Sequence, residues 1–204
     1  MQIHKGLHNL PKFKNAVLTI GTYDGVHFGH QQIIKRINDI AKEIDGESIL
    51  LTFDPHPRLV LKPNDDTLKL ISTIDEKEEL LETFGLHHLV IAEFSKDFAS
   101  MEAEEYVEKI LINNFHPKKI VIGYDHRFGK DRKGNIDLLR KLSEKYNYEV
   151  EEISAQTLDE ISVSSTKVRN ALLAGDIKHA NQFLAHPFTI KGKVVHGDKI
   201  SRIL

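Results

Sequence analysis

Two histidines, His27 and His30, stand three residues apart in the stretch GTYDGVHFGH, which covers residues 21–30. The apolar run AVLTI precedes this stretch, and an amphipathic run follows it. At the start of a helix, side chains three residues apart share one face, and the helix presents unpaired N–H groups and the positive end of its dipole. Two imidazole donors in such a place fit a chain of phosphates, although a turn with two solvated histidines would give the same pattern.

Three glycines, Gly21, Gly25 and Gly29, flank the two histidines. Glycine lets the backbone approach a ligand closely, so their positions favour the phosphate interpretation. The dipeptide Asp24-Gly25 alone indicates only a turn. It is the whole string between a strand and a helix that points to phosphate chemistry.

These residues have to be held by the elements around them, and the hydrophobic pattern of the chain predicts those elements. Short apolar, β-branched runs alternate with amphipathic runs of helical spacing. This alternation predicts an α/β fold, a Rossmann-like doubly wound parallel sheet with helices on both faces. The strands are expected at 16–20, 48–53, 87–94, 118–123 and 148–153, and the helices at 29–45, 75–85, 101–115, 135–146 and 164–175.

Four stretches follow the carboxyl ends of predicted strands, where open α/β sheets bind their ligands. They are residues 21–30, 52–58, 123–134 and 161–169. Because the strands are expected to be parallel, these stretches should meet in one crevice. Their convergence predicts an enzyme with a phosphate-containing substrate.

The stretch SSTKVRNALLAG, residues 164–175, begins with hydroxyl residues that fit a helix N-cap and ends with a glycine. Capping by Ser164 or Ser165 would explain this start without any ligand. Ser165, Thr166 and Arg169 would also face the expected crevice, and a guanidinium can bind phosphate oxygens through two hydrogen bonds. Capping and phosphate binding are compatible, so both interpretations stay open.

Two other stretches have both a structural and a functional interpretation. The loop 123–134 is either a solvated charged loop or a site for an aromatic, phosphorylated ligand, since it gathers Arg127, Lys130, Arg132 and Lys133. The stretch 52–58 contains two prolines that stiffen it, so a rigid exit from the strand would explain it. It also opens a predicted loop at 54–74, and a loop of that length is uncommon without a function.

Composition excludes several classes of protein. The 204 residues carry a formal net charge of −2 and contain no cysteine, so there is no disulfide, thiolate metal site or cysteine nucleophile. A nearly neutral chain has no overall basic field for nucleic acid or an anionic membrane. We find no signal peptide and no apolar run near the roughly 20 residues of a membrane helix, so we expect a soluble, cytoplasmic protein.

No histidine or carboxylate set has zinc spacing. We expect ordinary surface or core roles for His87, His88, His116, His179 and His186.

The stretch 21–30 resembles the His-x-Gly-His signature of nucleotidyltransferases, in the form found in bacterial FAD synthetases. These are bifunctional riboflavin kinase/FMN adenylyltransferases. The later stretches TFDPHPR, IGYDHRFGKDRKG and VSSTKVRNALLAGDIKHANQFL resemble further motifs of that family, in order, and the likeness covers about residues 1–204. The resemblance implies transfer of AMP from ATP to FMN, giving FAD and pyrophosphate, with Mg²⁺ bound mostly by phosphate and water.

The resemblance also implies roles for individual residues. His27, His30 and Arg169 are the expected catalytic residues. Those expected to bind ATP are Gly21, Thr22, Tyr23, Asp24, Gly25, Gly29, Ser165 and Thr166, and those expected to bind the flavin are Pro57, Asp125, Arg127, Phe128 and Arg132. His126 stands where the family commonly has phenylalanine, so we assign it no essential role, and we assign no protein ligand to the metal ion.

Two other functions fit parts of the pattern. A related nucleotidyltransferase acting on another phosphorylated acceptor, such as phosphopantetheine, would share the histidine pair without needing the arginine-rich loop. A non-catalytic nucleotide-sensing domain would bind ATP without turnover, and the two histidines together with Arg169 argue against it. The expected partners are ATP and FMN, without nucleic acid or membrane, and the oligomeric state is not indicated.

The last residues change character. Residues 186–204 alternate and contain a turn at His196-Gly197-Asp198, which predicts the start of a β-hairpin. They resemble the opening strand of the β-barrel riboflavin kinase domain, and the expected Pro-Thr-Ala-Asn segment would follow Leu204. We therefore expect an FMN adenylyltransferase domain at 1–185 and the start of a truncated kinase domain at 186–204. The longer parent would convert riboflavin to FMN.

Overall fold

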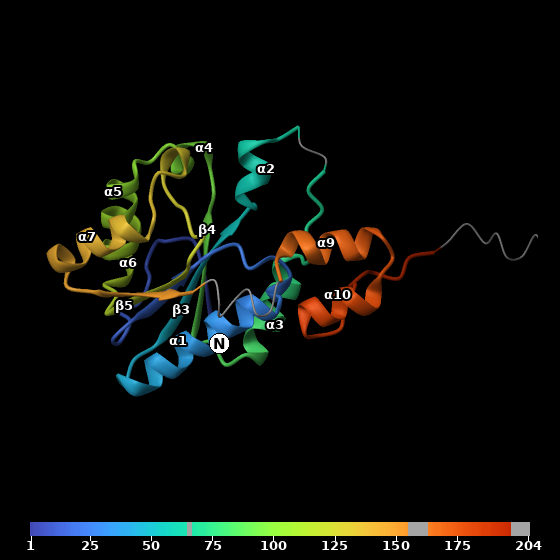
Figure 1. Cartoon of the computed structure of the whole chain (residues 1–204), viewed down its shortest axis with the longest axis horizontal. Helices are drawn as coiled ribbons and strands as arrows, with labels where there is room; N and C mark the ends of the chain where they lie inside the picture. Colours follow the sequence, from blue (N-terminus) through green and yellow to red (C-terminus); the bar gives the residue numbers. More distant parts are fainter. Residues whose placement is uncertain (65–66, 155–162, 197–204) are drawn as a thin grey trace, which may run out of the picture.

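One six-stranded sheet forms the centre of the molecule. The computed structural model describes residues 1–64, 67–154 and 163–196. The strand order is β1-β4-β3-β2-β5-β6, and every pairing is parallel (Figure 1). The strands are β1 (Gln2–Lys5), β2 (Val17–Ile20), β3 (Ser48–Asp54), β4 (His88–Glu93), β5 (Lys119–Gly123) and β6 (Glu149–Ile153).

The five strands expected from the hydrophobic pattern are confirmed within one or two residues at each end. β2 is buried along its whole length between β3 and β5, which explains its continuous apolar run. The pattern did not predict β1, whose sequence is Gln-Ile-His-Lys. This strand lies at the edge, where it pairs only with β4, so it does not need the apolar sequence of a central strand.

Helices cover both faces of the sheet, as expected. On one face, α1 (Phe28–Glu43) and α3 (Ile74–Thr83) pack their apolar sides against β2, β3 and β4. On the other face lie α5 (Ala103–Tyr106), η2 (Val107–Ile112), α6 (Asn113–Phe115) and α7 (Ile136–Tyr146). The first three follow one another directly and correspond to the helix expected at 101–115, with a π-helical middle.

The expected loop at 54–74 was wrong in one part, because it contains the short helix α2 (Pro57–Leu61). Pro57 stands in the first turn of this helix, and the Nδ1 atom of His56 accepts a hydrogen bond from Arg58 N at 3.2 Å. Proline in a first turn and a side-chain cap before it are helix-start signals. The two prolines of this stretch favour a rigid exit from the strand, whereas in the structure Pro57 begins a helix.

Two helices at one end of the molecule follow the last strand. They are α9 (Ser165–Leu173), which confirms the helix expected at 164–175, and α10 (Ile177–Leu184), which was not predicted. Asp176 caps α10, because its side chain accepts a hydrogen bond from His179 N. The two helices lie side by side (Figure 1) and share a small buried cluster with Ile71. The remaining short elements are η1 (Asp24–Val26), α4 (Lys96–Ala99) and η3 (Lys130–Arg132).

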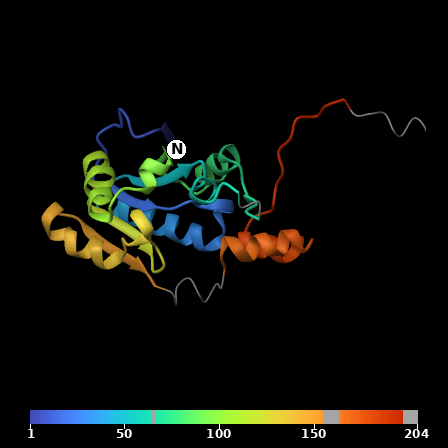
Figure 2. The same ribbon diagram turned by 90° about the horizontal axis from the view of Figure 1, so that it is seen from above.

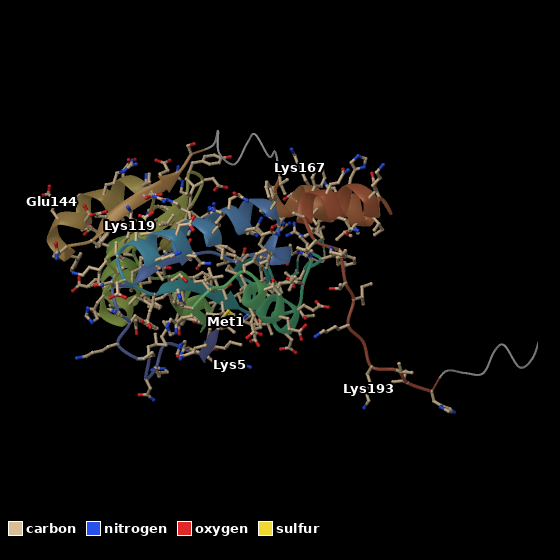
Figure 3. The ribbon with its side chains drawn as sticks, turned by 90° about the horizontal axis from the view of Figure 1, so that it is seen from below. Met1, Lys5, Lys119, Glu144, Lys167 and Lys193 are labelled. Carbon is tan, nitrogen blue, oxygen red and sulfur yellow. The ribbon has the colours of Figure 1, made fainter. Side chains whose placement is uncertain are left out.

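The hairpin expected at the end of the chain is absent from the part that the structure describes. Residues 186–196 form no strand, and the side chains of Ile190 and Val194 are 82% and 97% exposed. Instead, Phe188 N donates a hydrogen bond to Asn181 Oδ1 at 2.7 Å, which holds the chain against α10. The chain then leaves the body of the molecule (Figure 2), and Lys193 lies on this outlying part (Figure 3). Residues 197–198 of the expected turn lie outside the described residues, and the domain boundary at 185 stays a prediction.

Within the described ranges, no helix has the length and apolar character to cross a membrane.

Candidate active site

The two histidines form a ring stack at the start of α1. His27 is the N-cap residue of this helix, and the imidazole centroids of His27 and His30 lie 3.6 Å apart at an angle of 18°. The ring of Tyr23 stacks on His30 at 4.5 Å. The hydroxyl of Tyr23 is in turn within 3.1 Å of Thr19 Oγ1, on β2. The expectation that the two imidazoles share one face at a strand–helix junction is therefore confirmed.

Several donors at this place have no partner among the residues that the structure describes. The first backbone bond of α1 runs from Gln31 N to His27 O, so the N–H groups before Gln31 lack an intrahelical acceptor. No described side chain caps the helix. Among the described residues, the Nδ1 atoms of His27 and His30 are buried without a hydrogen-bond partner. Unpaired N–H groups at a helix start are a favourable environment for an anion.

Burial keeps both imidazoles neutral near pH 7. Burial lowers the pKa of His27 to about 4, although the charge of Asp24 opposes this shift. Burial also lowers the pKa of His30 well below its ordinary value, and the charges of His27 and Lys77 lower it further. Each ring therefore offers one N–H donor and one acceptor nitrogen, which is a hydrogen-bonding role and not that of a fixed cation.

The free energy of unfolding should fall as the pH drops from 6.5 toward 4. In this window the unfolded chain binds a proton at His27, whose folded pKa is about 4, so acidification favours unfolding. Titration of His27 should lower the free energy of unfolding by about 2 kcal/mol between pH 7 and pH 5. Denaturant titrations at both pH values measure it. His27→Asn should lose that part of the pH dependence, while His179→Asn, at an exposed ring, should keep it. An unchanged pH dependence in His27→Asn would contradict the burial argument.

Asp24 joins the loop 21–27 to two distant segments. Its Oδ1 atom accepts hydrogen bonds from Ile71 N at 2.9 Å and Ser72 N at 3.2 Å, and its Oδ2 atom accepts one from Arg169 Nη2 at 3.0 Å. The residue is 2% exposed. Its immediate role in this structure is to hold the loop against α9 and the segment before α3, and a direct role in binding ATP stays a prediction.

Gly25 is held where only glycine fits. Its N–H donates to Ser72 Oγ at 3.1 Å, its φ is +76°, and a Cβ atom added to it would lie 2.6 Å from Ile71 Cγ2. Gly21 and Gly29 do not have a positive φ, but a Cβ atom added to Gly21 would lie 2.9 Å from Tyr23 Cε2. Gly21 N is bonded to Leu51 O at 3.0 Å, and Gly29 is buried in α1. The loop 21–27 therefore takes its shape from contacts with Leu51, Ile71 and Ser72.

Gly25→Ala should lower the free energy of unfolding by about 2 kcal/mol or more, because it adds backbone strain and an overlap with Ile71. Gly175→Ala is the matched control: its φ is +74° but nothing lies within 4 Å of the added atom. It should lose only about 1 kcal/mol, the strain alone. Urea unfolding measures both. Equal losses in the two variants would contradict the packing against Ile71.

The start of α9 meets the loop 21–27. The side chain of Ser164 caps α9 by accepting a hydrogen bond from Lys167 N at 3.3 Å. Ser165 Oγ donates to Asp24 O at 3.1 Å, and Thr166 is exposed. Arg169 is mostly buried, and its Nε atom has no hydrogen-bond partner among the described residues. Its charge also reaches His27, where it lowers the pKa of the imidazole. The segments 21–30 and 164–169 therefore converge, as the sequence predicted.

The loop 123–134 follows β5, the neighbour of β2. Asp125, Arg127 and Arg132 are exposed on it, whereas Phe128 is 7% exposed and packs on Tyr106 with ring centroids 5.2 Å apart. Pro57, at the start of α2, is half-buried. Phe128 thus anchors the loop in the core, and the flavin contacts of all these residues stay predictions.

A group of aromatic rings at the same edge of the sheet was missed by the sequence analysis. Phe53 lies near the end of β3, Phe94 follows β4, and Phe98 lies on α4, with ring centroids 5.4–5.6 Å apart. All three are half-buried. Phe98 lies 5.8 Å from Tyr106, which continues the row toward Phe128. No sequence signal separated these residues from ordinary core aromatics, because they stand in or beside apolar strands.

His186, for which we expected an ordinary surface or core role, is half-buried, and its Nε2 atom lies 3.0 Å from Gly25 O. His56 is close enough to Asp24 for that charge to affect its pKa, which burial lowers. Lys77, on α3, is buried and donates a hydrogen bond to Thr22 O at 2.7 Å.

A cavity lies elsewhere in the described part of the molecule. It has a volume of about 520 Å³ and lies at the amino ends of β5 and β6, where Lys119, Glu144 and Tyr148 are among its lining residues. Figure 3 shows Lys119 and Glu144 at the end of the molecule away from Lys167, which is on α9. Sheets of this kind bind ligands at the carboxyl ends of their strands, so this cavity is separate from the site.

A parallel α/β sheet with stacked histidines at the start of its first crossover helix defines a protein of the nucleotidyltransferase type. The model of the FAD synthetase family matches residues 10–167. The chain belongs to this FAD synthetase family.

Relatives named bifunctional riboflavin kinase/FMN adenylyltransferase match the whole chain. The protein of Buchnera aphidicola subsp. Schizaphis graminum is 37% identical over 100% of this chain and 66% of its own length. That of Pseudomonas fluorescens is 36% identical over 100% and 65%, and that of Escherichia coli K12 is 32% identical over 100% and 66%. The chain thus spans slightly less than two thirds of the length of these relatives.

Solved structures share the fold. A crystal structure titled as a macrolide-efflux protein from Streptococcus pneumoniae has a TM-score of 0.84 and 28% identity, covering 100% of this chain and 66% of that one. The pantoate-beta-alanine ligase of Francisella tularensis has a TM-score of 0.50 at 15% identity, covering 90% of this chain and 86% of that one. The second likeness concerns the fold alone.

Proposed function

We propose that this chain is an FMN adenylyltransferase, which transfers AMP from ATP to FMN and gives FAD and pyrophosphate. The observation that carries the proposal is the meeting of the two helix starts at one place. The stacked rings of His27 and His30 at the start of α1 lie within electrostatic reach of Arg169, which Asp24 holds at the start of α9. Family membership supports the same activity.

ATP would bind with its phosphates between these two helix starts. The unpaired N–H groups at the start of α1 and the imidazole N–H groups would donate to the α-phosphate oxygens. The loop 21–27 would follow the nucleotide, with its Thr22 carbonyl turned into the protein toward Lys77. Neutral N–H donors suit this role, since each can form a hydrogen bond to a phosphate oxygen without a change of protonation.

In the reaction, a phosphate oxygen of FMN attacks the α-phosphorus of ATP. The new phosphorus–oxygen bond forms as the bond from the α-phosphorus to the bridging oxygen breaks, and that oxygen leaves with the electron pair as pyrophosphate. The FMN phosphate is already anionic at pH 7, so no strong base is required. Catalysis then consists of bringing two anions together and stabilising charge on the leaving group.

Arg169 would hold the leaving pyrophosphate. One end of its guanidinium is bound to Asp24, and its buried Nε atom has no partner among the described residues. Guanidinium groups can bind a phosphate through two parallel hydrogen bonds while keeping another contact. Ser165 and Thr166, in the first turn of α9, would add hydroxyl donors.

The flavin would lie over the carboxyl ends of β3 and β4, the strands next to β2. Phe53, Phe94 and Phe98 offer aromatic surface at the ends of β3 and β4, which suits a planar ring system. Pro57 and the exposed side chains of Asp125, Arg127 and Arg132 border this surface in our proposal. The arginines would pair with the FMN phosphate.

Mg²⁺ would be held at this site mainly by the substrates. The described residues contain no group of three or more His, Asp or Glu side chains that could hold a metal ion, and the carboxylate of Asp24 is already bound by Arg169 and two backbone N–H groups. Phosphate oxygens and water are ordinary ligands of Mg²⁺. When bound, the ion would neutralise part of the phosphate charge.

Incubation of the chain with FMN, Mg²⁺ and ATP tests the proposal. FAD and pyrophosphate should appear in equal amounts, CTP should replace ATP poorly, and riboflavin should give no product. FAD formation absent under all conditions, with the protein folded, would contradict it. A cytidylyl dinucleotide formed preferentially from CTP would favour another nucleotidyltransferase.

The division into domains belongs to the same proposal. Residues 1–185 would form the adenylyltransferase domain, and 186–204 would begin a second domain, in keeping with the kinase named in the relatives. A longer protein of that kind would phosphorylate riboflavin and pass FMN to the site described above.

A further inference from the structure

Lys77 is a buried cation with few partners. It stands in the first half of α3, and only 6% of its surface is exposed. Its Nζ atom donates a hydrogen bond to Thr22 O at 2.7 Å. Lysine is rarely buried to this extent without a carboxylate partner. Among the described residues, no carboxylate lies within 4.0 Å of this ammonium.

The nearby acidic residues do not neutralise Lys77. Burial lowers the pKa of Lys77, and the charges of Asp24 and Asp54 raise it only in part. Asp24 is already paired with Arg169 at 3.0 Å. The ammonium has three donors and, among the described residues, uses one of them in a hydrogen bond, so it has donors left for an anion.

The position of Lys77 is fixed from two sides. Thr73 and Glu76 form a capping box that begins α3 one turn before Lys77. Thr22 O, which accepts from Lys77, also accepts from Thr52 Oγ1 at 3.3 Å, so this carbonyl is turned into the protein. The charge of Lys77 reaches His30, where it lowers the pKa of the ring. The ammonium therefore lies beneath the loop 21–27, close to the proposed place of the phosphates.

We propose that Lys77 is a positioning residue for ATP, and this inference rests on the proposed function. It holds the carbonyl of Thr22 away from the bound phosphates, so that the loop does not present an acceptor oxygen to an anion. Its charge also attracts the triphosphate from beneath the loop 21–27. The ligand class is thus a nucleoside triphosphate, and Lys77 acts on it through Thr22 and through its charge without reacting.

A purely structural lysine would behave differently. Burying an ammonium without a carboxylate is unfavourable for the fold, and an apolar side chain of similar length avoids that loss of hydration. The inference therefore requires that Lys77→Met keeps or raises thermal stability while it weakens ATP binding. A lysine that serves only the fold would show reduced stability and unchanged affinity.

Three variants test this difference: Lys77→Met, Lys77→Arg, and Lys141→Met as a control at an exposed lysine of α7 paired with Glu104. Calorimetry with α,β-methylene-ATP and Mg²⁺, without FMN, measures affinity, and thermal unfolding measures stability. Lys77→Met should bind the analogue about 10- to 100-fold more weakly than wild type, with a Tm that is equal or higher. Lys77→Arg should recover most of the affinity, and Lys141→Met should match wild type.

Wild-type affinity in Lys77→Met would overturn the inference, and so would a variant that unfolds or has a clearly lower Tm. These outcomes are distinguishable from failure of the proposed function. The binding measurement does not involve FMN, so it stands even if wild type makes no FAD. A wild-type protein that neither binds the analogue nor makes FAD would overturn both.

Discussion

Replacing His30 with alanine should lower kcat for FAD formation by about 1,000-fold or more, with the protein still folded. His30 lies in the middle of the stack, between Tyr23 and His27, at the start of α1. In the proposed mechanism its loss would remove one donor to the α-phosphate and also the surface that orients the ring of His27. Steady-state production of FAD, followed by its separation from FMN, measures the effect, and circular dichroism verifies the fold.

Two further variants separate chemistry from packing at this position. His30→Gln keeps a donor in place and should lose less activity than His30→Ala. His179→Ala removes an exposed imidazole on α10 and should retain wild-type activity. A fully active His30→Ala protein would exclude this imidazole from the reaction.

Replacing Arg169 with lysine should lower kcat/KM for ATP by about 100-fold, although the charge is kept. Lysine can replace the ion pair with Asp24, which spans 3.0 Å, but it cannot pair with Asp24 and bind a phosphate through two hydrogen bonds at once. Because the pair is mostly buried, Arg169→Ala would leave Asp24 without its cation and should lower stability by about 3 kcal/mol or more. The lysine variant is therefore the more informative one.

The result for Arg169→Lys decides between two roles of this residue. If Arg169 only ties α9 to the loop 21–27, the lysine variant should keep near wild-type kcat/KM once its stability is taken into account. Asp24→Asn is the complementary variant, since it weakens the contact between Arg169 and the loop 21–27 while leaving the guanidinium of Arg169 in place. We expect Asp24→Asn to lower stability, and to lower kcat/KM less than Arg169→Lys does.

The periodicity of the sequence was sufficient to predict the layers of the fold. The five central strands and the long helices have strong patterns because they bury one or both faces. The elements that were missed have weak patterns: β1 is a polar edge strand, and α2 and α10 are short helices whose starts depend on single capping residues, His56 and Asp176. The expected hairpin at 186–204 followed an alternating pattern, but a strand also needs a neighbouring strand, and the described part of the chain provides none beside residues 190–196.

The site was predicted where chemistry-bearing residues stand together in the sequence. His27, His30, Ser165 and Arg169 occur in two short strings, and the parallel topology brings those strings together. Lys77 was not predicted because its burial depends on a contact with Thr22, which lies 55 residues earlier in the chain. An isolated lysine on an amphipathic helix normally indicates a solvated face, so only the three-dimensional structure could identify it.

Labelled ATP tests the central claim most directly. The chain is incubated with FMN, Mg²⁺ and ATP that carries ³²P either in the α position or in the γ position. Adenylyl transfer at the meeting point of α1 and α9 predicts that the α label enters FAD and that the γ label leaves in pyrophosphate. Label from the γ position in the flavin product, or no label in any flavin product, would contradict it.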